Sequence, residues 1–295
     1  MKKLIVGVVI ILVGVGIYYF TKSGNELKVT KNEEATNTLD QTATSTSNKP
    51  ESVIGKSVEG RDIAAYHFGT GETELLFIGG IHGGYEWNTS LVAYELVDYL
   101  KLNPAIVPNN VKVTVIPVLN PDGLNKTVGK PGRFVRGDVP ASQESQIAGR
   151  FNANTVDLNR NFDCDWQTSA VWQNKNVSGG ASVFSEPESK AIKNYVEANK
   201  PKAVVVWYSS AGGVFASSCH NGVSAETKAL TKVYATASGY PAYENFDFYE
   251  ITGDMVNWLA KMNIPAISVL LTNHTDTEWN KNVKGIEAVL KQYAE

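Results

Sequence analysis

The sequence is poor in cysteine and histidine and carries little net charge. Its 295 residues include two cysteines, Cys164 and Cys219, which excludes a four-thiolate zinc site. Its four histidines leave few nitrogen ligands for a metal ion. A formal net charge of −3 gives no electrostatic basis for binding nucleic acid. Hydrophobic residues make up 43% of the chain, which is enough for a sizeable core.

One long stretch lacks charged side chains. Residues 4–20 are almost all apolar or small and follow two lysines. This length is at the short end for a membrane span and is long for the apolar part of a signal peptide. No small-residue cleavage site follows; instead Tyr18, Tyr19 and Phe20 fit an aromatic belt at a membrane interface. We therefore predict an uncleaved signal anchor over residues 1–21, with the lysines inside the cytoplasm.

The anchor predicts a single-pass protein of the cell membrane with its main domain outside the cytoplasm. The alternative is a secreted protein released by signal cleavage. Residues 22–50 are rich in Thr, Asn, Ser, Glu and Lys and contain few large apolar side chains. Such a segment buries too little surface to fold, so we expect a disordered linker.

From residue 51 to residue 295, strand-like and helix-like segments alternate. This pattern predicts one α/β domain with a mostly parallel or mixed central sheet flanked by helices. The residues Asn120-Pro121-Asp122-Gly123 predict a turn. The expected strands are residues 75–78, 111–118, 203–208 and 264–271, and the expected helices are residues 91–100, 186–199, 225–238, 254–262 and 278–293.

A glycine-rich turn carrying His82 and Glu86 follows the expected strand 75–78. In an open α/β sheet, ligands bind at the carboxyl ends of the strands. An imidazole and a carboxylate suit Zn²⁺, and neighbouring glycines let the backbone approach an ion closely. The alternative is a tight turn whose two polar side chains are merely solvated.

The segment Val156–Phe162 reads Val-Asp-Leu-Asn-Arg-Asn-Phe. Together with the turn from His82 to Trp87, it resembles the zinc carboxypeptidase family of the carboxypeptidase A type, in a bacterial, membrane-anchored form. The resemblance covers most of residues 55–293. Its further landmarks follow in order: Asn120–Gly123, Tyr249 with Thr252-Gly253, and Ile264-Pro265-Ala266.

For the metal, the resemblance implies that His82 and Glu86 are two zinc ligands. It implies that Asp157 is the carboxylate that orients a ligand histidine, as metal-bound imidazoles commonly require. For the substrate, it implies that Asn159 and Arg160 hold the terminal carboxylate of a peptide, a task that suits a planar guanidinium. An ordinary ion-pair network is the alternative for Asp157 and Arg160.

Two more residues acquire roles from the resemblance. Arg150 matches the arginine that polarises the scissile carbonyl and stabilises the oxyanion. Tyr249 matches the mobile tyrosine that closes over the substrate. The expected partner is therefore a peptide with a free C-terminal carboxylate.

The sequence departs from the family pattern at two decisive positions. Ser209 stands where the third zinc ligand is expected, and Leu270 stands where the general base is expected. A third, smaller departure is the extra residue between His82 and Glu86, which Gly83 and Gly84 could absorb. A catalytic zinc normally has three protein ligands, and the bound water needs a base. We therefore expect weak zinc binding and impaired catalysis.

Few residues could compensate. The other histidines are His67, His220 and His274, and each is expected to be an ordinary surface or rim histidine. Glu250 and Asp254 could in principle act as substitute bases. Asp254 also lies with Val256 where a specificity pocket is expected, which permits either an apolar or a basic preference.

Three functions remain open. The family activity is hydrolysis of C-terminal residues from peptides, including cell-wall peptides, and we expect it to be lost or crippled while peptide binding is retained. The alternatives are an active zinc exopeptidase with replacement residues and a scaffold without a working site. Cys164 and Cys219 flank one site in an oxidising compartment, so we also predict that they form a disulfide.

Overall fold

The computed structural model describes residues 49–294. The predicted anchor (residues 1–21) lies outside the described residues, as does the predicted linker (22–50) apart from its last two positions. Within the described part of the chain, no helix has the length and apolar character needed to cross a membrane.

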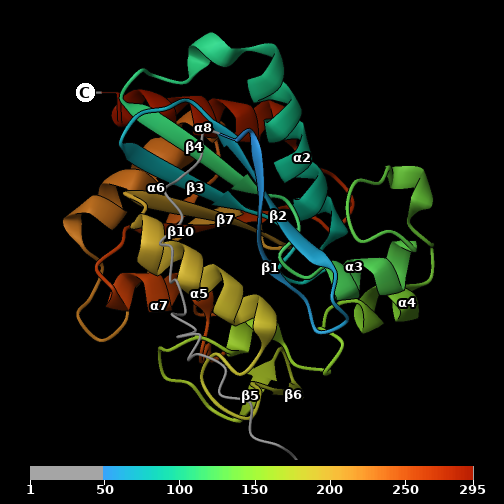
Figure 1. Cartoon of the computed structure of the whole chain (residues 1–295). Coiled ribbons are helices and arrows are strands. Elements are labelled where there is room, and N and C mark those ends of the chain that lie inside the picture. The colour runs from blue at the N-terminus through green and yellow to red at the C-terminus, as the bar shows by residue number, and fades with distance from the viewer. Residues whose placement is uncertain (1–48, 295) are drawn as a thin grey trace, which may run out of the picture. The chain divides into compact units, whose positions relative to one another are not determined.

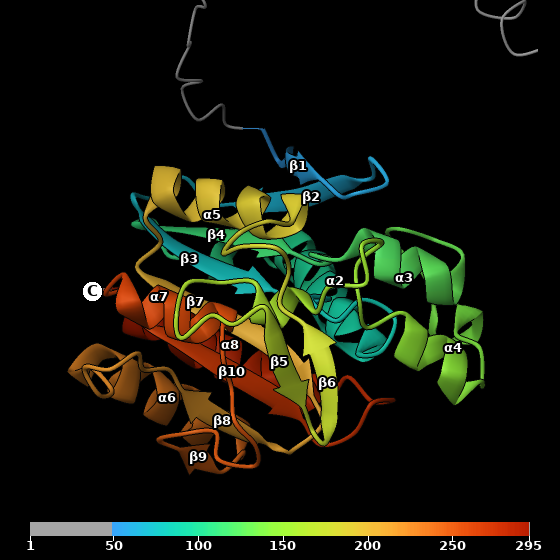
Figure 2. The same ribbon diagram turned by 90° about the horizontal axis from the view of Figure 1, so that it is seen from below.

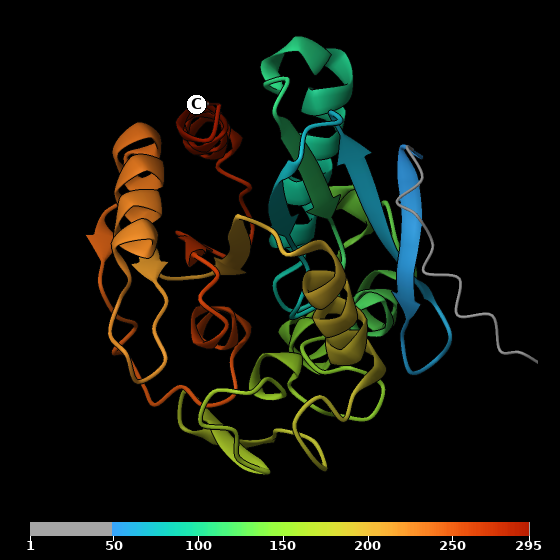
Figure 3. The same cartoon turned by 60° about the vertical axis from the view of Figure 1, so that its left-hand side comes forward.

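An eight-stranded mixed sheet forms the centre of the domain (Figure 1). The strand order is β1-β2-β4-β3-β7-β10-β8-β9, with β1 and β9 at opposite edges (Figure 3). Strands β4, β3, β7 and β10 run parallel, whereas β2 and β8 pair antiparallel with β4 and β10. The strands are β1 (Glu51–Lys56), β2 (Asp62–Phe68), β3 (Thr73–Ile78), β4 (Val111–Ile116), β7 (Ala203–Ser209), β8 (Gly213–Ala216), β9 (Ala242–Tyr243) and β10 (Ala266–Leu271), with β5 (Ser169–Trp172) and β6 (Lys175–Ser178) in a separate hairpin (Figure 2).

Helices cover both faces of this sheet, which confirms the predicted fold class. One apolar core joins the sheet to α2, α6 and α8, and a second joins its other face to α5 and α7. The helices are α2 (Trp87–Leu102), α3 (Pro121–Val128), α4 (Gln143–Ala148), α5 (Pro187–Asn199), α6 (Ala225–Ser238), α7 (Met255–Lys261) and α8 (Trp279–Gln292), with short 3-10 turns η1 (Pro104–Ile106), η2 (Arg136–Asp138) and η3 (Leu158–Arg160).

Strand β7 is apolar almost throughout because it lies in the middle of the sheet and is buried on both faces. Side chains alternate along a strand, so Val205 and Trp207 pack in the core of α2 while Val206 and Tyr208 pack in the core of α5 and α7. This alternation decides which side chain at the end of β7 faces the site described below.

The turn predicted at Asn120–Gly123 is wrong, because these residues begin helix α3. The Asn120 side chain accepts a hydrogen bond of 2.8 Å from the amide of Gly123, and Pro121 occupies the first helical position. The same residue types favour turns and helix starts, so the sequence signal was ambiguous.

Candidate functional site

A cavity of about 460 Å³ lies where the parallel strands β7 and β10 end. Its lining brings together predicted site residues from six separate parts of the chain, and Asp157 lies behind the wall, fully buried. The predicted residues in the lining are His82, Glu86, Arg150, Asn159, Arg160, Ser209, Tyr249 and Leu270.

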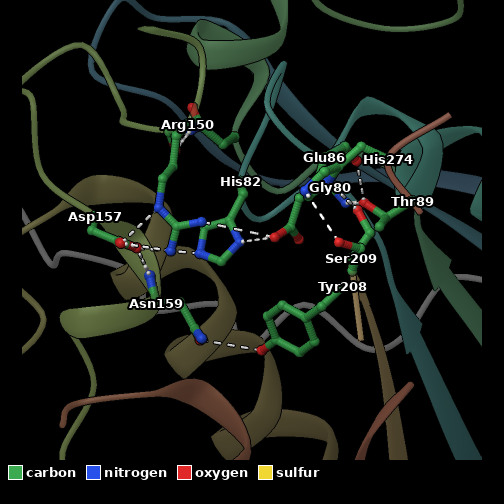
Figure 4. A network of polar contacts seen from close by, with 12 residues as sticks. Gly80, His82, Glu86, Thr89, Arg150, Asp157, Asn159, Tyr208, Ser209 and His274 are labelled. Atoms are coloured by element: carbon green, nitrogen blue, oxygen red, sulfur yellow. Dashed lines mark hydrogen bonds and ion pairs between the residues drawn. The ribbon is translucent and has the colours of Figure 1, made fainter. Parts of the chain in front are cut away.

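His82 stands between two carboxylates (Figure 4). Its Nδ1 atom lies 3.0 Å from Oε1 of Glu86, and its Nε2 atom lies 3.3 Å from Oδ1 of Asp157. All three side chains are buried. Nε2 is directed at Asp157, which fixes the orientation of the ring. Nδ1 is directed at Glu86 and is the nitrogen available for a cation.

The turn that carries His82 fixes its neighbours through close backbone packing. Gly84 donates a hydrogen bond of 3.0 Å to the carbonyl of Gly149, which places Arg150 beside His82. A Cβ atom on Gly84 would lie 1.8 Å from Oγ1 of Thr127, so only glycine fits there. Gly83 has a φ of +43°, and this left-handed residue accommodates the longer turn.

Arg150 is buried and binds Asp157 with two nitrogens. Its Nε and Nη2 atoms donate to Oδ2 of Asp157 at 3.0 and 2.8 Å, and its Nη1 lies 3.8 Å from Glu86. Burial alone would raise the pKa of the Asp157 carboxyl, but the charges of Arg150 and His82 hold that pKa well below its usual range. Asp157 is therefore ionised across the physiological pH range.

The donor atoms around His82 fit part of a zinc site. Nδ1 of His82 and Oε2 of Glu86 are buried and have no hydrogen-bond partner among residues 49–294. Buried polar atoms are normally paired, so these orphaned atoms are suited to a cation. His82 and Glu86 supply two ligands, and a complete catalytic site needs a third.

Strand β7 presents Tyr208 to His82. The two rings lie 5.8 Å apart, and Tyr208 shares the core of α5 and α7 with Leu270. Burial raises the pKa of the Tyr208 hydroxyl well above its ordinary value, so it is a neutral phenol. Its hydroxyl donates to Oδ1 of Asn159 at 3.1 Å.

Ser209, which the sequence places at the third-ligand position, has other partners. Its Oγ atom lies 3.1 Å from Oδ1 of Asn88, at the start of α2, and 2.8 Å from Nδ1 of His274 (Figure 4). Because successive side chains point to opposite faces, Ser209 turns toward α2 when Tyr208 faces His82. The residue of β7 opposite His82 is thus a tyrosine.

Arg160 is buried, and its hydrogen bonds go to backbone carbonyls. Nε and Nη2 donate to the carbonyl of Val171, and Nη1 donates to that of Asn159. Within residues 49–294 it pairs with no carboxylate, and two of the five guanidinium N–H groups stay unclaimed. Tyr249 lies beside it, with its ring centre 6.0 Å from the guanidinium carbon, and burial raises the pKa of this tyrosine.

Glu250 and Asp254, the candidate substitute bases, line the cavity, but most of the other histidines lie elsewhere. His67 bonds Ser52 and Thr114 on the outer strands, and His220 is an exposed partner of Asp165. His274 is the exception, because its contact with Ser209 brings it to the rim of the site, where burial lowers its pKa. Alternation along β7 shows that only one of Tyr208 and Ser209 can face His82, but it does not select Tyr208.

Cys164 and Cys219 form a disulfide with their Cα atoms 6.1 Å apart. This separation lies within the range that a disulfide spans. The bond joins the segment after η3 to the segment after β8, and the carbonyl of Cys164 accepts a hydrogen bond from Gly253. The disulfide therefore braces the wall of the cavity that contains Asp254.

Comparison with known proteins gives one consistent family. The family model described as zinc carboxypeptidase matches residues 35–292. Carboxypeptidase Z of Gallus gallus is 31% identical over 182 residues, covering 57% of this chain and 26% of that protein. The catalytic chain of carboxypeptidase N of Homo sapiens is 28% identical over 211 residues, covering 66% of this chain and 40% of that protein. The chain thus spans about a quarter to two fifths of the length of these relatives.

Solved structures share the fold at low sequence identity. Murein-tripeptide amidase from Escherichia coli O157 is 21% identical with a TM-score of 0.59, covering 82% of this chain and 92% of that chain. Carboxypeptidase A from Helicoverpa armigera is 20% identical with a TM-score of 0.63, covering 83% and 68%. At these identities the likeness supports the architecture and nothing finer.

Proposed function

The chain belongs to the zinc carboxypeptidase family, and from this premise we propose that it binds the C-terminal carboxylate of peptides and hydrolyses them slowly or not at all. The observation that carries the proposal is the pair of side chains that face the cavity from β7 and β10. Tyr208 and Leu270 occupy the strand ends beside His82. We infer that Tyr208 holds the third-ligand position and that Leu270 holds the position of the base.

Under this proposal, the set of residues that would bind zinc is incomplete. His82 and Glu86 are the residues that would hold a zinc ion, and zinc would supply Lewis acidity and an acidified water. A phenol with a raised pKa is a poor third ligand, and a leucine accepts no proton. Asp157 still orients His82, and Arg150 already places a positive charge beside Glu86.

The residues that would bind the terminal carboxylate, Asn159 and Arg160, support the proposal that peptide binding is retained. Arg160 keeps unclaimed N–H groups and needs no metal to bind an anion. Tyr208 and the amide of Met255 both donate to Oδ1 of Asn159, which holds the Asn159 side chain in place without a metal. A terminal carboxylate can therefore bind at Arg160 whether or not a metal ion is present.

The test is a pair of peptides that differ only at the C-terminus. We expect a peptide acid to bind the protein more tightly than its C-terminal amide, and Arg160→Ala to abolish the difference. Arg136→Ala, on an exposed turn, is the matched control and should keep it. Equal binding of acid and amide by the unchanged protein would contradict the proposal and favour a scaffold role.

We also propose that the domain acts outside the cytoplasm, on peptides such as those of the cell wall. The support is the charge-free stretch at residues 4–20. A protease added to intact cells should release the domain if it is anchored outside. Protection of the domain until the cells are lysed would contradict this location.

A second candidate is an active zinc exopeptidase whose site is completed by another residue. The orphaned atoms of His82 and Glu86 favour it, and His274 is the nearest candidate because it contacts Ser209. Metal analysis separates the two candidates, because the second requires tightly held zinc at one ion per chain.

A further inference from the structure

Four side chains that can bind a metal ion gather around the disulfide. They belong to Cys164 and its neighbour Asp165, and to Cys219 and its neighbour His220. One ligand atom from each residue lies within 4.8 Å of the other three. None of the four residues lines the cavity described above. The cluster is therefore separate from the candidate functional site.

The side chains of Asp165 and His220 meet beside the sulfur atoms. Both residues have a left-handed backbone, with φ of +53° and +62°, which is uncommon outside glycine. Nε2 of His220 lies 3.0 Å from Oδ1 of Asp165, and Oδ2 of Asp165 lies 3.7 Å from Sγ of Cys164. These two side chains are mostly open to solvent, whereas both cysteines are buried. An ion that arrives from solvent would thus meet the imidazole and the carboxylate first.

Both cysteine segments are also held in place by bonds other than the disulfide. The carbonyl of Cys164 accepts a hydrogen bond of 2.6 Å from the amide of Gly253. The amide of Ser218, next to the second cysteine, donates a hydrogen bond of 3.0 Å to Oδ1 of Asn257. Gly253 and Asn257 belong to one short stretch around the start of α7. We therefore expect the two cysteines to stay side by side when the bond between them is open.

The oxidation state of sulfur decides what this cluster can bind. A thiolate is a strong metal ligand, whereas a disulfide leaves only the exposed imidazole and carboxylate. Once the disulfide is open, the set becomes two thiolates, one imidazole and one carboxylate, which suits tetrahedral Zn²⁺. Around such an ion the donor atoms stand roughly 3.3–3.8 Å apart. The cluster would have to contract by about 1 Å, which rotation of the side chains can supply.

We propose that this cluster is a zinc site that forms only when the Cys164–Cys219 disulfide is reduced. A dithiol breaks the bond between the two sulfurs, becomes a cyclic disulfide and leaves one hydrogen on each cysteine. One Zn²⁺ then displaces the two thiol protons into solvent, and no electron passes to the metal. Zinc would link the same two segments that the disulfide links, so they stay joined in a reducing environment.

The experiment uses the purified full chain and Co²⁺, which replaces Zn²⁺ and absorbs strongly when a thiolate binds it. The chain has no other cysteines, so this absorption reports on the cluster and not on the cavity. The protein is reduced with a dithiol, which is removed by gel filtration under nitrogen before cobalt is added. We expect one cobalt ion with thiolate absorption per reduced chain, no such absorption in the oxidised protein, and loss of the signal when zinc is added.

Two variants test the imidazole and the carboxylate. His220→Asn and Asp165→Asn both keep the backbone conformation, because asparagine tolerates the left-handed region. Each should weaken cobalt and zinc binding by about tenfold or more, since an amide is a poor zinc ligand. Asp163→Asn is the matched control, because Asp163 pairs with Lys261 and lies outside the cluster. It should bind cobalt as the unchanged protein does.

Three results would overturn the inference. The first is thiolate absorption that both His220→Asn and Asp165→Asn leave unchanged, because the two cysteines alone would then explain it. The second is a reduced, folded protein that binds no cobalt. The third is a reduced chain that unfolds, as followed by circular dichroism, and stays unfolded with zinc, since a metal site of the folded state should stabilise that state. The peptide acid and amide test is independent of these results, so a failure here leaves the proposed function standing.

Discussion

Tyr208 and Leu270 are register partners on the adjacent parallel strands β7 and β10, and both line the cavity that holds His82. Parallel partners share a face of the sheet, so the two side chains lie side by side above the core of α5 and α7. Under the proposed function, Tyr208 stands at the position of the third metal ligand and Leu270 at the position of the base. The two proposed losses would therefore meet at one point of the site.

The first prediction is that chemistry returns when both positions are changed together. Tyr208→His should restore firm zinc binding with little turnover, because no base is present. Leu270→Glu alone should do little, because no metal is held. The double variant should release C-terminal residues from peptides at a rate roughly tenfold or more above either single variant, since such residues act as one unit. Product release with and without added zinc is the measurement.

Ser209→His is the matched control for this experiment. The sequence alone favours Ser209 as the missing ligand, but its side chain contacts Asn88 and His274. We expect Ser209→His combined with Leu270→Glu to stay inactive. Activity in that control and none in the Tyr208 variant would place the third ligand at Ser209 after all.

The second prediction concerns the metal content of the unchanged protein. With two ligands, His82 and Glu86, zinc should bind weakly and be lost on gel filtration in buffer without zinc. The measurement is zinc per chain before and after the column. Tightly held zinc would favour the second candidate function, and His274→Ala would then show whether His274 is the third ligand.

The sequence predicts the layered α/β fold well because apolar runs such as 203–208 and 264–271 alternate with helix-like segments, which favours buried strands. It also identifies residues that meet at the cavity, because their motifs together resemble those of one family. It does not fix which of Tyr208 and Ser209 faces His82, because that depends on pairing with β10 and β3 across the sheet. A shift of one residue exchanges the two faces.

The burial and electrostatic environment of Asp254 likewise could not be predicted from the sequence. Its place before a helix can be read from the sequence, since aspartate is a common helix cap. The burial of its carboxyl depends on which segments pack against it, and these come from distant parts of the chain. Burial and charge arise from packing, so they appear only in the folded structure.

The third prediction concerns the stability contributed by the Arg150–Asp157 pair. Asp157→Asn should lower the free energy of unfolding by about 3–5 kcal/mol, because it leaves a buried guanidinium without its carboxylate. The chain offers a matched surface pair in Arg133 and Asp98, which are also joined by two hydrogen bonds. Asp98→Asn should cost about 0–1 kcal/mol, because water screens that pair. Urea unfolding of both variants is the measurement, and equal losses would contradict the argument.

The last prediction concerns Asp254 and pH. Burial raises the pKa of its carboxyl to about 6, against the opposing charge of Arg160, from an ordinary value near 3.8. The folded protein thus binds more protons at Asp254 than the unfolded chain does between these two values. The contribution of Asp254 to the free energy of unfolding therefore falls as pH rises through that window. Above the folded pKa, the full destabilisation by the ionised carboxylate is present.

Asn resembles the protonated carboxyl and caps a helix equally well, so Asp254→Asn removes this cost. A shift of about two pKa units corresponds to roughly 3 kcal/mol. We expect the variant to match the unchanged protein near the unfolded pKa and to be more stable by up to that amount above the folded pKa, in urea unfolding across this pH range. The exposed change Glu244→Gln should show no such trend. A difference that is the same at every pH would mean that Asp254 does not titrate in the folded protein as its burial requires.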